Sequence, residues 1–392
     1  MNETVVVVGG GYGGAAVAAA LDEHADVVLV EPKDAFVHSA GALRALVRPD
    51  WAPNMFFRYD RLLTRGRVVR ARAASVDAGG VTLESGERIE AGHIVLASGS
   101  GYPYPAKMRT DVADEALAQL RGTHEELAKA GRVLITGAGP VGLELAGEIK
   151  AVWPDKRVTV VDPAERLVPA FADEMRADLH RQLDERGIEV RLGTALSEPP
   201  PVEPGRARTF TVDGITADIW FRAHGVAVQT SYLGADLAAA RTPEGRIRVT
   251  ETLNVEGFPN VYALGDVTDL DEAKMAGYAM KHAEVVAANI AARVRGEEPA
   301  ATYAPSPIPS VLLPLGPDRG VGQFPGPDGP LVVSAETVAD YKGRDLFVGR
   351  FAELFKTAEP LSAPLPEPSA EPLPQPPSEP SAEPTAEPVD VG

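Results

Sequence analysis

Cysteine is absent from this chain of 392 residues. Without cysteine the chain can form no disulfide bond, iron–sulfur cluster, thiolate metal site or dithiol redox relay. The seven histidines are scattered and lack the paired spacing that is typical of a zinc site, so we expect no metal. If the protein carries electrons, they must therefore reside on a bound organic cofactor.

Long apolar runs and an excess of positive charge are also missing. No apolar stretch reaches the roughly 20 residues that span a bilayer. The first residues lead into a predicted strand, without the charged-then-apolar pattern of a secretory leader. The formal net charge is −18, whereas nucleic-acid binding requires a basic surface. We therefore expect a cytoplasmic protein that binds no nucleic acid.

Two glycine-rich turns are the main positive feature. Each follows a predicted apolar strand (TVVVV and RVLIT) and precedes a predicted helix. Both have G-x-G-x-x-G spacing, with Gly9, Gly11 and Gly14 in the first turn and Gly137, Gly139 and Gly142 in the second. The first glycine permits the tight bend, the second admits a pyrophosphate, and the third lets the helix pack closely on the strand. The pair predicts two dinucleotide sites; the alternative is two ordinary βαβ crossovers whose glycines serve packing only.

An acidic residue follows each turn at the distance expected for a contact with ribose. Glu31 lies 22 residues after Gly9, and Asp162 lies 25 residues after Gly137. A carboxylate here accepts hydrogen bonds from a ribose and repels a 2′-phosphate, so NADH is favoured over NADPH at the second turn. Arg166 is near enough in the sequence to weaken that preference.

The order of elements predicts an α/β protein with two Rossmann-like units, the second inserted into the first. We expect the first unit over residues 1–105 and 236–299, with a long helix over 272–295. The second unit is expected over 106–235, and a separate C-terminal α/β domain over 300–356.

The composition changes after that domain. Residues 357–392 contain seven acidic residues, no lysine or arginine, and repeats of EPSAEP. Such a segment has too little apolar surface to offset the entropy of ordering, so we expect a disordered tail. A docking role for the tail is the alternative.

Three segments together resemble the flavin signature of the flavoprotein reductases that have two dinucleotide-binding domains. They are the first glycine turn, HIVLASGS and NVYALGDVTDL. The resemblance implies FAD at the first turn and NADH at the second. It also implies that Gly265 and Asp266 lie at the ribityl–phosphate region of the flavin, and that the following helix points at the isoalloxazine ring.

A narrower resemblance covers about residues 4–356. The blocks DAFVHSAGALRALV, GAGPVGLELAGEIK, MAGYAMKHAEVVAANI and KGRDLFVGRF are similar to those of the apoptosis-inducing-factor-like, ferroptosis-suppressor-type NAD(P)H:quinone oxidoreductases, which are relatives of type II NADH dehydrogenases. Disulfide reductases of the superfamily carry a redox CxxxxC pair where this chain has residues 38–44. The flavin is therefore expected to pass electrons directly to an acceptor.

Four side chains are candidates for a role at the flavin. The resemblance places Glu144 beside the nicotinamide and the flavin, where a buried carboxylate would tune hydride transfer; the alternative is a surface acid favoured by the helix dipole. Lys107 resembles a flavin-side lysine, or is a solvated loop residue. Arg44 would supply the same charge or bind the FAD pyrophosphate, or form a salt bridge on its helix. His282 would donate a proton to a quinone, or be a buried core histidine.

The segment DLFVGRFAELFK has aromatic residues on one helical face, with Phe347, Phe351 and Phe355 spaced four apart and basic residues beside them. A helix of this kind could lie on an anionic membrane surface, and the protein would then make peripheral contact with the inner face of the membrane. Alternatively, the helix packs on the C-terminal sheet.

Together these patterns predict an FAD-dependent NADH:acceptor oxidoreductase. Hydride passes from NADH to FAD and two electrons then go to a quinone-type acceptor, while the protein supplies geometry and electrostatics. Reduction of a ferredoxin, a small metabolite or oxygen is an alternative. A flavin-based NADH sensor that changes its binding partners is another. These alternatives differ in the fate of the reduced flavin.

Overall fold

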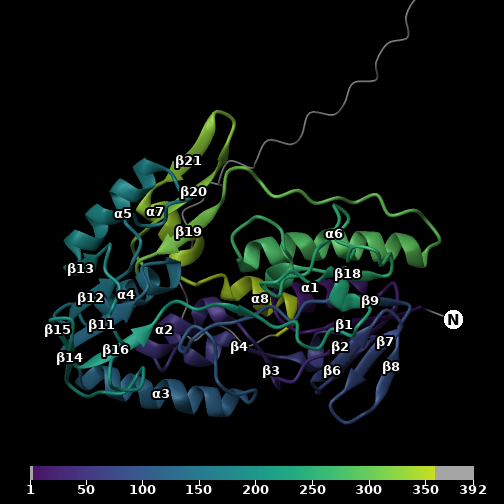
Figure 1. The fold of residues 1–392 in the computed structure, drawn as a ribbon, viewed down its shortest axis with the longest axis horizontal. Coiled ribbons are helices and arrows are strands. Elements are labelled where there is room, and N and C mark those ends of the chain that lie inside the picture. The colour runs from purple at the N-terminus through teal and green to yellow at the C-terminus, as the bar shows by residue number, and fades with distance from the viewer. Residues whose placement is uncertain (1–2, 358–392) are drawn as a thin grey trace, which may run out of the picture.

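The computed structural model describes residues 3–357. The tail predicted from residue 357 onward lies outside the described residues, except for its first residue. Figure 1 shows the first dinucleotide-binding unit on the right, the second on the left, and the C-terminal sheet above the second. No helix in the described part combines the length and the apolar character needed to cross a membrane.

The first unit is built on a five-stranded parallel sheet with the strand order β18-β9-β1-β2-β5. Valine-rich β1 (Thr4–Val8) lies at its centre, where both faces of a strand are buried, which suits its continuous run of valines. The other strands of this sheet are β2 (Asp26–Val30), β5 (Arg67–Val69), β9 (His93–Leu96) and β18 (Val261–Ala263).

The two faces of that sheet are covered differently. Val5 and Val7 face two helices, α1 (Tyr12–Leu21) and α6 (Ala276–Val294). Val6 and Val8 point the other way, because side chains alternate along a strand, and pack on a three-stranded antiparallel sheet. The strands of the latter are β6 (Ala73–Asp77), β7 (Gly80–Leu83) and β8 (Arg88–Glu90).

Helix α6 is shorter at its start than the sequence predicts. The expected helix covers residues 272–295, whereas the structure begins α6 at Ala276. Residues 271–275 instead form an irregular segment that lines the large cavity described below. The correction matters because Glu272, expected on a helix, belongs to that segment.

The second unit repeats the design with a four-stranded parallel sheet in the order β13-β12-β11-β16. Its strands are β11 (Arg132–Thr136), β12 (Arg157–Val161), β13 (Ile188–Arg191) and β16 (Ile219–Arg222). Its helices are α3 (Ala113–Lys129), α4 (Pro140–Val152) and α5 (Asp173–Glu185), and a hairpin is formed by β14 (Phe210–Val212) and β15 (Ile215–Ala217).

Short elements join the two units. The antiparallel pair β10 (Ser100–Gly101) and β17 (Ala227–Val228) forms where the chain leaves the first unit and where it returns. Helix α2 (Ala42–Val47) of the first unit also packs on α4 of the second. A further two-stranded sheet, β3 (Ala35–Val37) with β4 (Phe56–Arg58), lies on the first unit.

The C-terminal sheet packs on the second unit, and the last helix returns to the first. Strands β19 (Val311–Pro314), β20 (Gly320–Gly326) and β21 (Gly329–Val333) are antiparallel, and β19 and β20 contact α4 and α5. Helix α7 (Ala335–Val338) and a π turn (Ala339–Gly343) then lead to α8 (Val348–Leu354), which lies beside α1 in Figure 1.

The aromatic residues of this last segment do not form a free membrane-binding face. Phe351 is 4% exposed and Phe355 is 1% exposed. Their rings pack against Phe36 and Phe57 of the β3–β4 sheet. Only Phe347 of the three is exposed. The predicted membrane anchor is therefore wrong for Phe351 and Phe355. The packed alternative holds, but the surface that receives the helix belongs to the first unit rather than to the C-terminal sheet.

Candidate functional site

A cavity of about 2500 Å³ lies between the two units and the C-terminal segment. It is lined by both glycine-rich turns and by the segments 38–40, 97–102, 271–281 and 306–312. The predicted site residues that line it are Gly9, Gly11, Glu31, Lys107, Gly139, Glu144, Asp162, Gly265 and Asp266. The fold therefore brings most of the predicted residues to one continuous space.

The first glycine turn has the shape that a bound pyrophosphate requires. Gly9 has φ +100°, and a Cβ atom there would lie 2.6 Å from the carbonyl oxygen of Ala97. A Cβ at Gly14 would lie 1.8 Å from the carbonyl oxygen of Gly9. At Gly11, by contrast, a Cβ would meet nothing within 4 Å and would project into open space. The turn is thus closed on the protein side and open toward the cavity, at the N-terminus of α1.

The second turn reproduces this geometry. Gly137 has φ +109°, and its Cβ would lie 2.5 Å from the carbonyl oxygen of Ala223. A Cβ at Gly142 would lie 1.9 Å from the carbonyl oxygen of Gly137, while a Cβ at Gly139 would again meet nothing within 4 Å. Both turns therefore offer room and helix N–H groups for a dinucleotide pyrophosphate.

The two acidic residues are held in matching ways. Glu31 accepts hydrogen bonds from Gly10 N at 2.6 Å and from Lys33 N at 3.0 Å. Asp162 accepts hydrogen bonds from Ala138 N at 2.7 Å and from Ala164 N at 2.8 Å. Each carboxylate is thus fixed at its strand end, one oxygen on the glycine turn and the other two residues downstream. This is the arrangement needed to receive a ribose.

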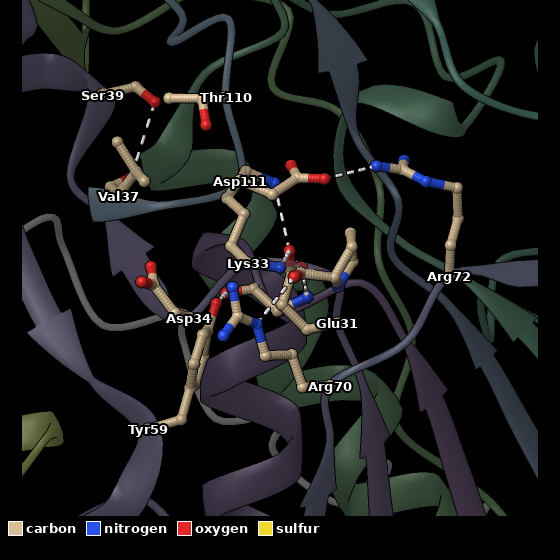
Figure 2. A network of polar contacts seen from close by, with 12 residues as sticks. Glu31, Lys33, Asp34, Val37, Ser39, Tyr59, Arg70, Arg72, Thr110 and Asp111 are labelled. Atoms are coloured by element: carbon tan, nitrogen blue, oxygen red, sulfur yellow. Dashed lines mark hydrogen bonds and ion pairs between the residues drawn. The ribbon is translucent and has the colours of Figure 1, made fainter. Parts of the chain in front are cut away.

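The two acidic residues differ in their basic neighbours. Basic residues lie close to Glu31, whereas the arginine that could bind a 2′-phosphate beside Asp162 pairs with another residue. Figure 2 shows Glu31 with Lys33 and Arg70 close by, and the Arg72–Asp111 ion pair beyond them. At the second turn, Arg166 is paired with Asp173, at 2.7 Å, rather than with Asp162.

Asp266 and Lys107 lie on the side of the cavity that belongs to the first unit. Ser100 Oγ donates a hydrogen bond to Asp266 Oδ2 at 2.5 Å. Burial lowers the pKa of Lys107, an effect that the nearby charge of Asp266 opposes and that of Lys33 reinforces. Lys107 has no hydrogen-bond or ion-pair partner among residues 3–357, so its ammonium is available to a ligand in the cavity.

Glu144 lies on the first turns of α4, lines the cavity and is partly covered by the C-terminal segment, with its side chain 14% exposed. Lys342 Nζ lies 2.8 Å from Glu144 Oε1 and also donates a hydrogen bond to Leu312 O at 2.9 Å. Burial raises the pKa of Glu144, and the Lys342 charge opposes that rise. The exposed surface acid considered as the alternative is therefore ruled out. Lys342 was not singled out from the sequence, because nothing local connects it with a residue almost 200 positions earlier.

Arg44 does not face the cavity. Its Nη2 lies 2.7 Å from Glu148 Oε1, and its guanidinium also donates hydrogen bonds to the carbonyl oxygens of Gly343 and Arg344. Its side chain is 3% exposed. The proposal that Arg44 binds FAD or supplies charge at the flavin is therefore wrong. The salt-bridge alternative holds, but the bridge joins α2 to α4 rather than staying within one helix.

His282 does not face the cavity either. Gly265 N donates a hydrogen bond to His282 Nδ1 at 3.0 Å, and His282 Nε2 lies 2.8 Å from Glu272 Oε1. The residue is 1% exposed. Because His282 is buried away from the cavity, with Nδ1 bonded to Gly265 N and Nε2 lying against Glu272, the predicted role as proton donor to a quinone is wrong, and the buried-histidine alternative is correct.

Two residues that were not selected from the sequence contact each other in the cavity, and one of them, His38, lies at the position of the redox cysteine pair. Tyr12 and His38 line the cavity, and Tyr12 Oη lies 3.1 Å from His38 Nδ1. His38 Nε2 lies 2.6 Å from Leu346 O, and Tyr12 Oη accepts a hydrogen bond from Ala40 N. Burial lowers the pKa of His38 to about 4. A tyrosine after the second glycine and a histidine at the CxxxxC position were the available signals.

Comparison with known proteins agrees with this geometry. Residues 3–288 match the family described as pyridine nucleotide-disulphide oxidoreductase. The chain therefore belongs to that family, whose members bind FAD and NAD(P)H. The α/β fold and the two cofactors expected from the sequence are confirmed, and the protein is an FAD-dependent NAD(P)H oxidoreductase.

Particular relatives narrow the class. Ferroptosis suppressor protein 1 of Taeniopygia guttata is 32% identical over 358 residues, which cover 88% of this chain and 94% of the relative. Apoptosis-inducing factor homolog B of Dictyostelium discoideum is 27% identical, covering 92% and 98% respectively. Among solved structures, the sulfide:quinone oxidoreductase of Aquifex aeolicus superposes with a TM-score of 0.72 at 18% identity, covering 90% of this chain and 91% of that one. The subgroup resemblance seen in the sequence is thus confirmed.

Proposed function

We propose that this enzyme oxidises NADH and delivers two electrons, through FAD bound at the first turn, to a quinone-type acceptor. FAD when bound accepts a hydride from the nicotinamide and releases electrons to a second substrate. The protein's own residues hold the two dinucleotides, exclude water between them and admit the acceptor.

The single observation that carries the proposal is the continuity of the cavity. One space of about 2500 Å³ touches Gly11, Gly139 and the C-terminal segment. The chain has no cysteine that could relay electrons away from that space. An acceptor must therefore enter the same cavity, beyond the volume that the two dinucleotides fill.

The residues divide the cavity by charge. Glu31, Lys107 and Asp266 line the part that belongs to the first unit, where they suit the riboses and pyrophosphate of FAD. Asp162 stands at the second turn and forms no ion pair with any residue from 3 to 357, and Arg166 is engaged by Asp173. That arrangement supports NADH rather than NADPH.

The cavity lining is largely apolar. Leu312, Phe324, Leu331 and Phe347 line it, and Leu331 and Phe347 are exposed. Apolar walls favour a planar hydrophobic acceptor over a charged protein. A structural neighbour is consistent with such an acceptor, since the Aquifex aeolicus protein that shares the fold is a sulfide:quinone oxidoreductase.

Stopped-flow reoxidation tests this proposal. The holoenzyme is reduced anaerobically with one equivalent of NADH and mixed separately with a menaquinone analogue, a ferredoxin and dissolved oxygen. We expect the quinone to reoxidise the flavin much faster than the other two. Faster reoxidation by ferredoxin or oxygen would show that this compound, and not a quinone, is the preferred acceptor. A reduced flavin that none of the three reoxidises would favour the sensor function.

A further inference from the structure

A chain of buried contacts lies behind the turn formed by Gly265 and Asp266. Gly265 N donates to His282 Nδ1 at 3.0 Å, and His282 Nε2 lies 2.8 Å from Glu272 Oε1. Tyr303 Oη donates to the other carboxylate oxygen, Glu272 Oε2, at 2.6 Å. The side chains of His282 and Glu272 are 1% and 5% exposed. Four segments of the chain thus meet in one line of contacts.

The contacts fix where the protons are. Because Gly265 N–H donates to Nδ1, this nitrogen of His282 must be unprotonated, so the ring proton is on Nε2, the nitrogen that lies 2.8 Å from Glu272 Oε1. Burial raises the pKa of Glu272, but its hydrogen bonds with His282 and Tyr303 outweigh burial, and the net pKa is lowered. Gly265 thus contacts one ring nitrogen of His282 and Glu272 contacts the other, and these two contacts fix the orientation of the ring.

Two further hydrogen bonds hold the Gly265–Asp266 turn. Gly265 has φ +71°, a backbone conformation that glycine adopts readily. Its carbonyl oxygen accepts a hydrogen bond from Thr268 Oγ1 at 2.9 Å. Asp266 Oδ2 accepts from Ser100 Oγ, and Asp266 Oδ1 has no hydrogen-bond partner among residues 3–357. The turn is thus rigid on the protein side and leaves one carboxylate oxygen for a ligand.

We propose that Glu272, His282 and Tyr303 form a positioning relay that holds the Gly265–Asp266 turn in the geometry that binds FAD. The inference rests on the proposed function in one respect, that FAD occupies the first turn and reaches Asp266. None of the three residues transfers a proton to the acceptor. His282 acts through Gly265, and Glu272 and Tyr303 act through His282.

The relay also accounts for the late start of α6. Glu272 must turn inward to reach His282, which lies ten residues later and inside that helix. The chain from 271 to 275 therefore cannot continue the helical path backwards. Its irregular course places Asp271, Lys274 and Met275 along the cavity.

Equilibrium binding of FAD to the apoprotein tests the relay without any measurement of turnover. His282→Leu removes both contacts and leaves the Gly265 N–H buried without a partner, so we expect FAD affinity to fall about tenfold or more. His282→Asn keeps an acceptor where Nδ1 lies and should retain affinity within about threefold. Glu272→Gln keeps the Gly265–His282 contact and a neutral hydrogen-bonding group of the same shape, so it should lose no more affinity than His282→Asn.

Asn289→Leu is the matched control for damage to α6. Asn289 is also fully buried, lies two turns further along the same helix, and hydrogen-bonds the backbone of Thr252 and Ala301 away from the cavity. We expect it to lower the melting temperature of the apoprotein at least as much as His282→Leu, with FAD affinity almost unchanged.

Two results would overturn the inference. The first is an equal loss of FAD affinity in Asn289→Leu and His282→Leu, which would show that His282 affects FAD binding only by stabilising the fold. The second is an His282→Asn enzyme that binds FAD normally and is reduced by NADH but cannot pass electrons on, which would make His282 a proton donor. A wild-type flavin that quinone fails to reoxidise would instead refute only the proposed acceptor.

Discussion

Two acidic residues one turn apart on α4 each hold a cation from a distant part of the chain. Glu144 binds Lys342 of the C-terminal segment, and Glu148 binds Arg44 of α2. Buried ion pairs add little net stability, because desolvation of both charges offsets their attraction. Removing one partner is costly, however, because it leaves the other charge buried and unpaired. At the residue scale, these pairs therefore fix relative positions around the cavity more than they stabilise the fold.

Arg44→Met tests the assignment of Arg44 as structural. It leaves Glu148 buried and unpaired, so we expect the free energy of unfolding of the apoprotein to fall by about 3–5 kcal/mol. The double variant Arg44→Met/Glu148→Met should recover most of that loss, which denaturant unfolding would show. If the Arg44→Met variant folds with normal stability but binds FAD poorly, Arg44 would instead be part of the cofactor site.

His38 predicts a specific acid sensitivity. Its folded-state pKa of about 4 lies below the unfolded value of about 6.5. The unfolded chain therefore takes up the proton first, so the contribution of His38 is complete above pH ~6.5 and is lost as pH falls toward ~4. The slope is about 1.4 kcal/mol per pH unit.

His38→Gln isolates this effect because its amide can still donate to Leu346 O. The difference in unfolding free energy between wild type and variant, measured from pH 7 to pH 4, should narrow as pH falls. A difference that does not change with pH would show that His38 is protonated in the folded state as readily as in the unfolded one.

At the scale of elements, each glycine turn has one position that serves the fold and another that serves the ligand. Gly14→Ala would force its Cβ against the carbonyl oxygen of Gly9, whereas Gly11→Ala would project its Cβ into the open cavity. We expect Gly14→Ala to destabilise the apoprotein by about 1–3 kcal/mol or more. Gly11→Ala should leave its stability within about 0.5 kcal/mol.

The same pair separates folding from cofactor binding. Gly11→Ala should lower FAD affinity about tenfold or more because its methyl group occupies space needed by the pyrophosphate. Gly139→Ala should leave FAD bound and weaken NADH instead. Flavin absorbance after purification and NADH titration would check both, and loss of flavin from Gly139→Ala would show that the two sites are exchanged.

Elements with a strong local pattern were predictable from the sequence, and those defined by distant partners were not. The strands before both glycine turns, and the helices α1 and α4 after them, lie where the sequence pattern predicted them. The early part of α6 was predicted as helix because its composition suits one. A buried contact between Glu272 and His282 overrides that propensity.

The candidate site shows the same division. Glu31 and Asp162 follow from spacing within one βαβ unit. Lys342 and Tyr303 reach their partners only after the C-terminal segment has folded back, so no local pattern reports them. For Arg44 and His282 the structural alternatives hold, because sequence alone does not show which way a buried side chain points.

At the scale of the whole molecule, the C-terminal segment ties the two dinucleotide units together. Lys342 reaches the second unit, while Phe351 packs on the first. Phe351→Ala should lower the free energy of unfolding by about 3–5 kcal/mol because it empties a buried aromatic cluster. Phe347→Ala, at an exposed position in the same segment, is the matched control and should change stability by no more than about 0.5 kcal/mol. Similar losses in both would show that Phe347 is also buried in solution.

The central claim is that one cavity brings a nicotinamide at the second turn to a flavin at the first. Anaerobic mixing of the purified yellow protein with NADH tests it most directly. We predict that the visible absorbance of the oxidised flavin bleaches on mixing, and that Gly139→Ala slows this bleaching while keeping its flavin. Protein that purifies without flavin and cannot be reconstituted with it, or flavin that NADH leaves oxidised, would contradict the account.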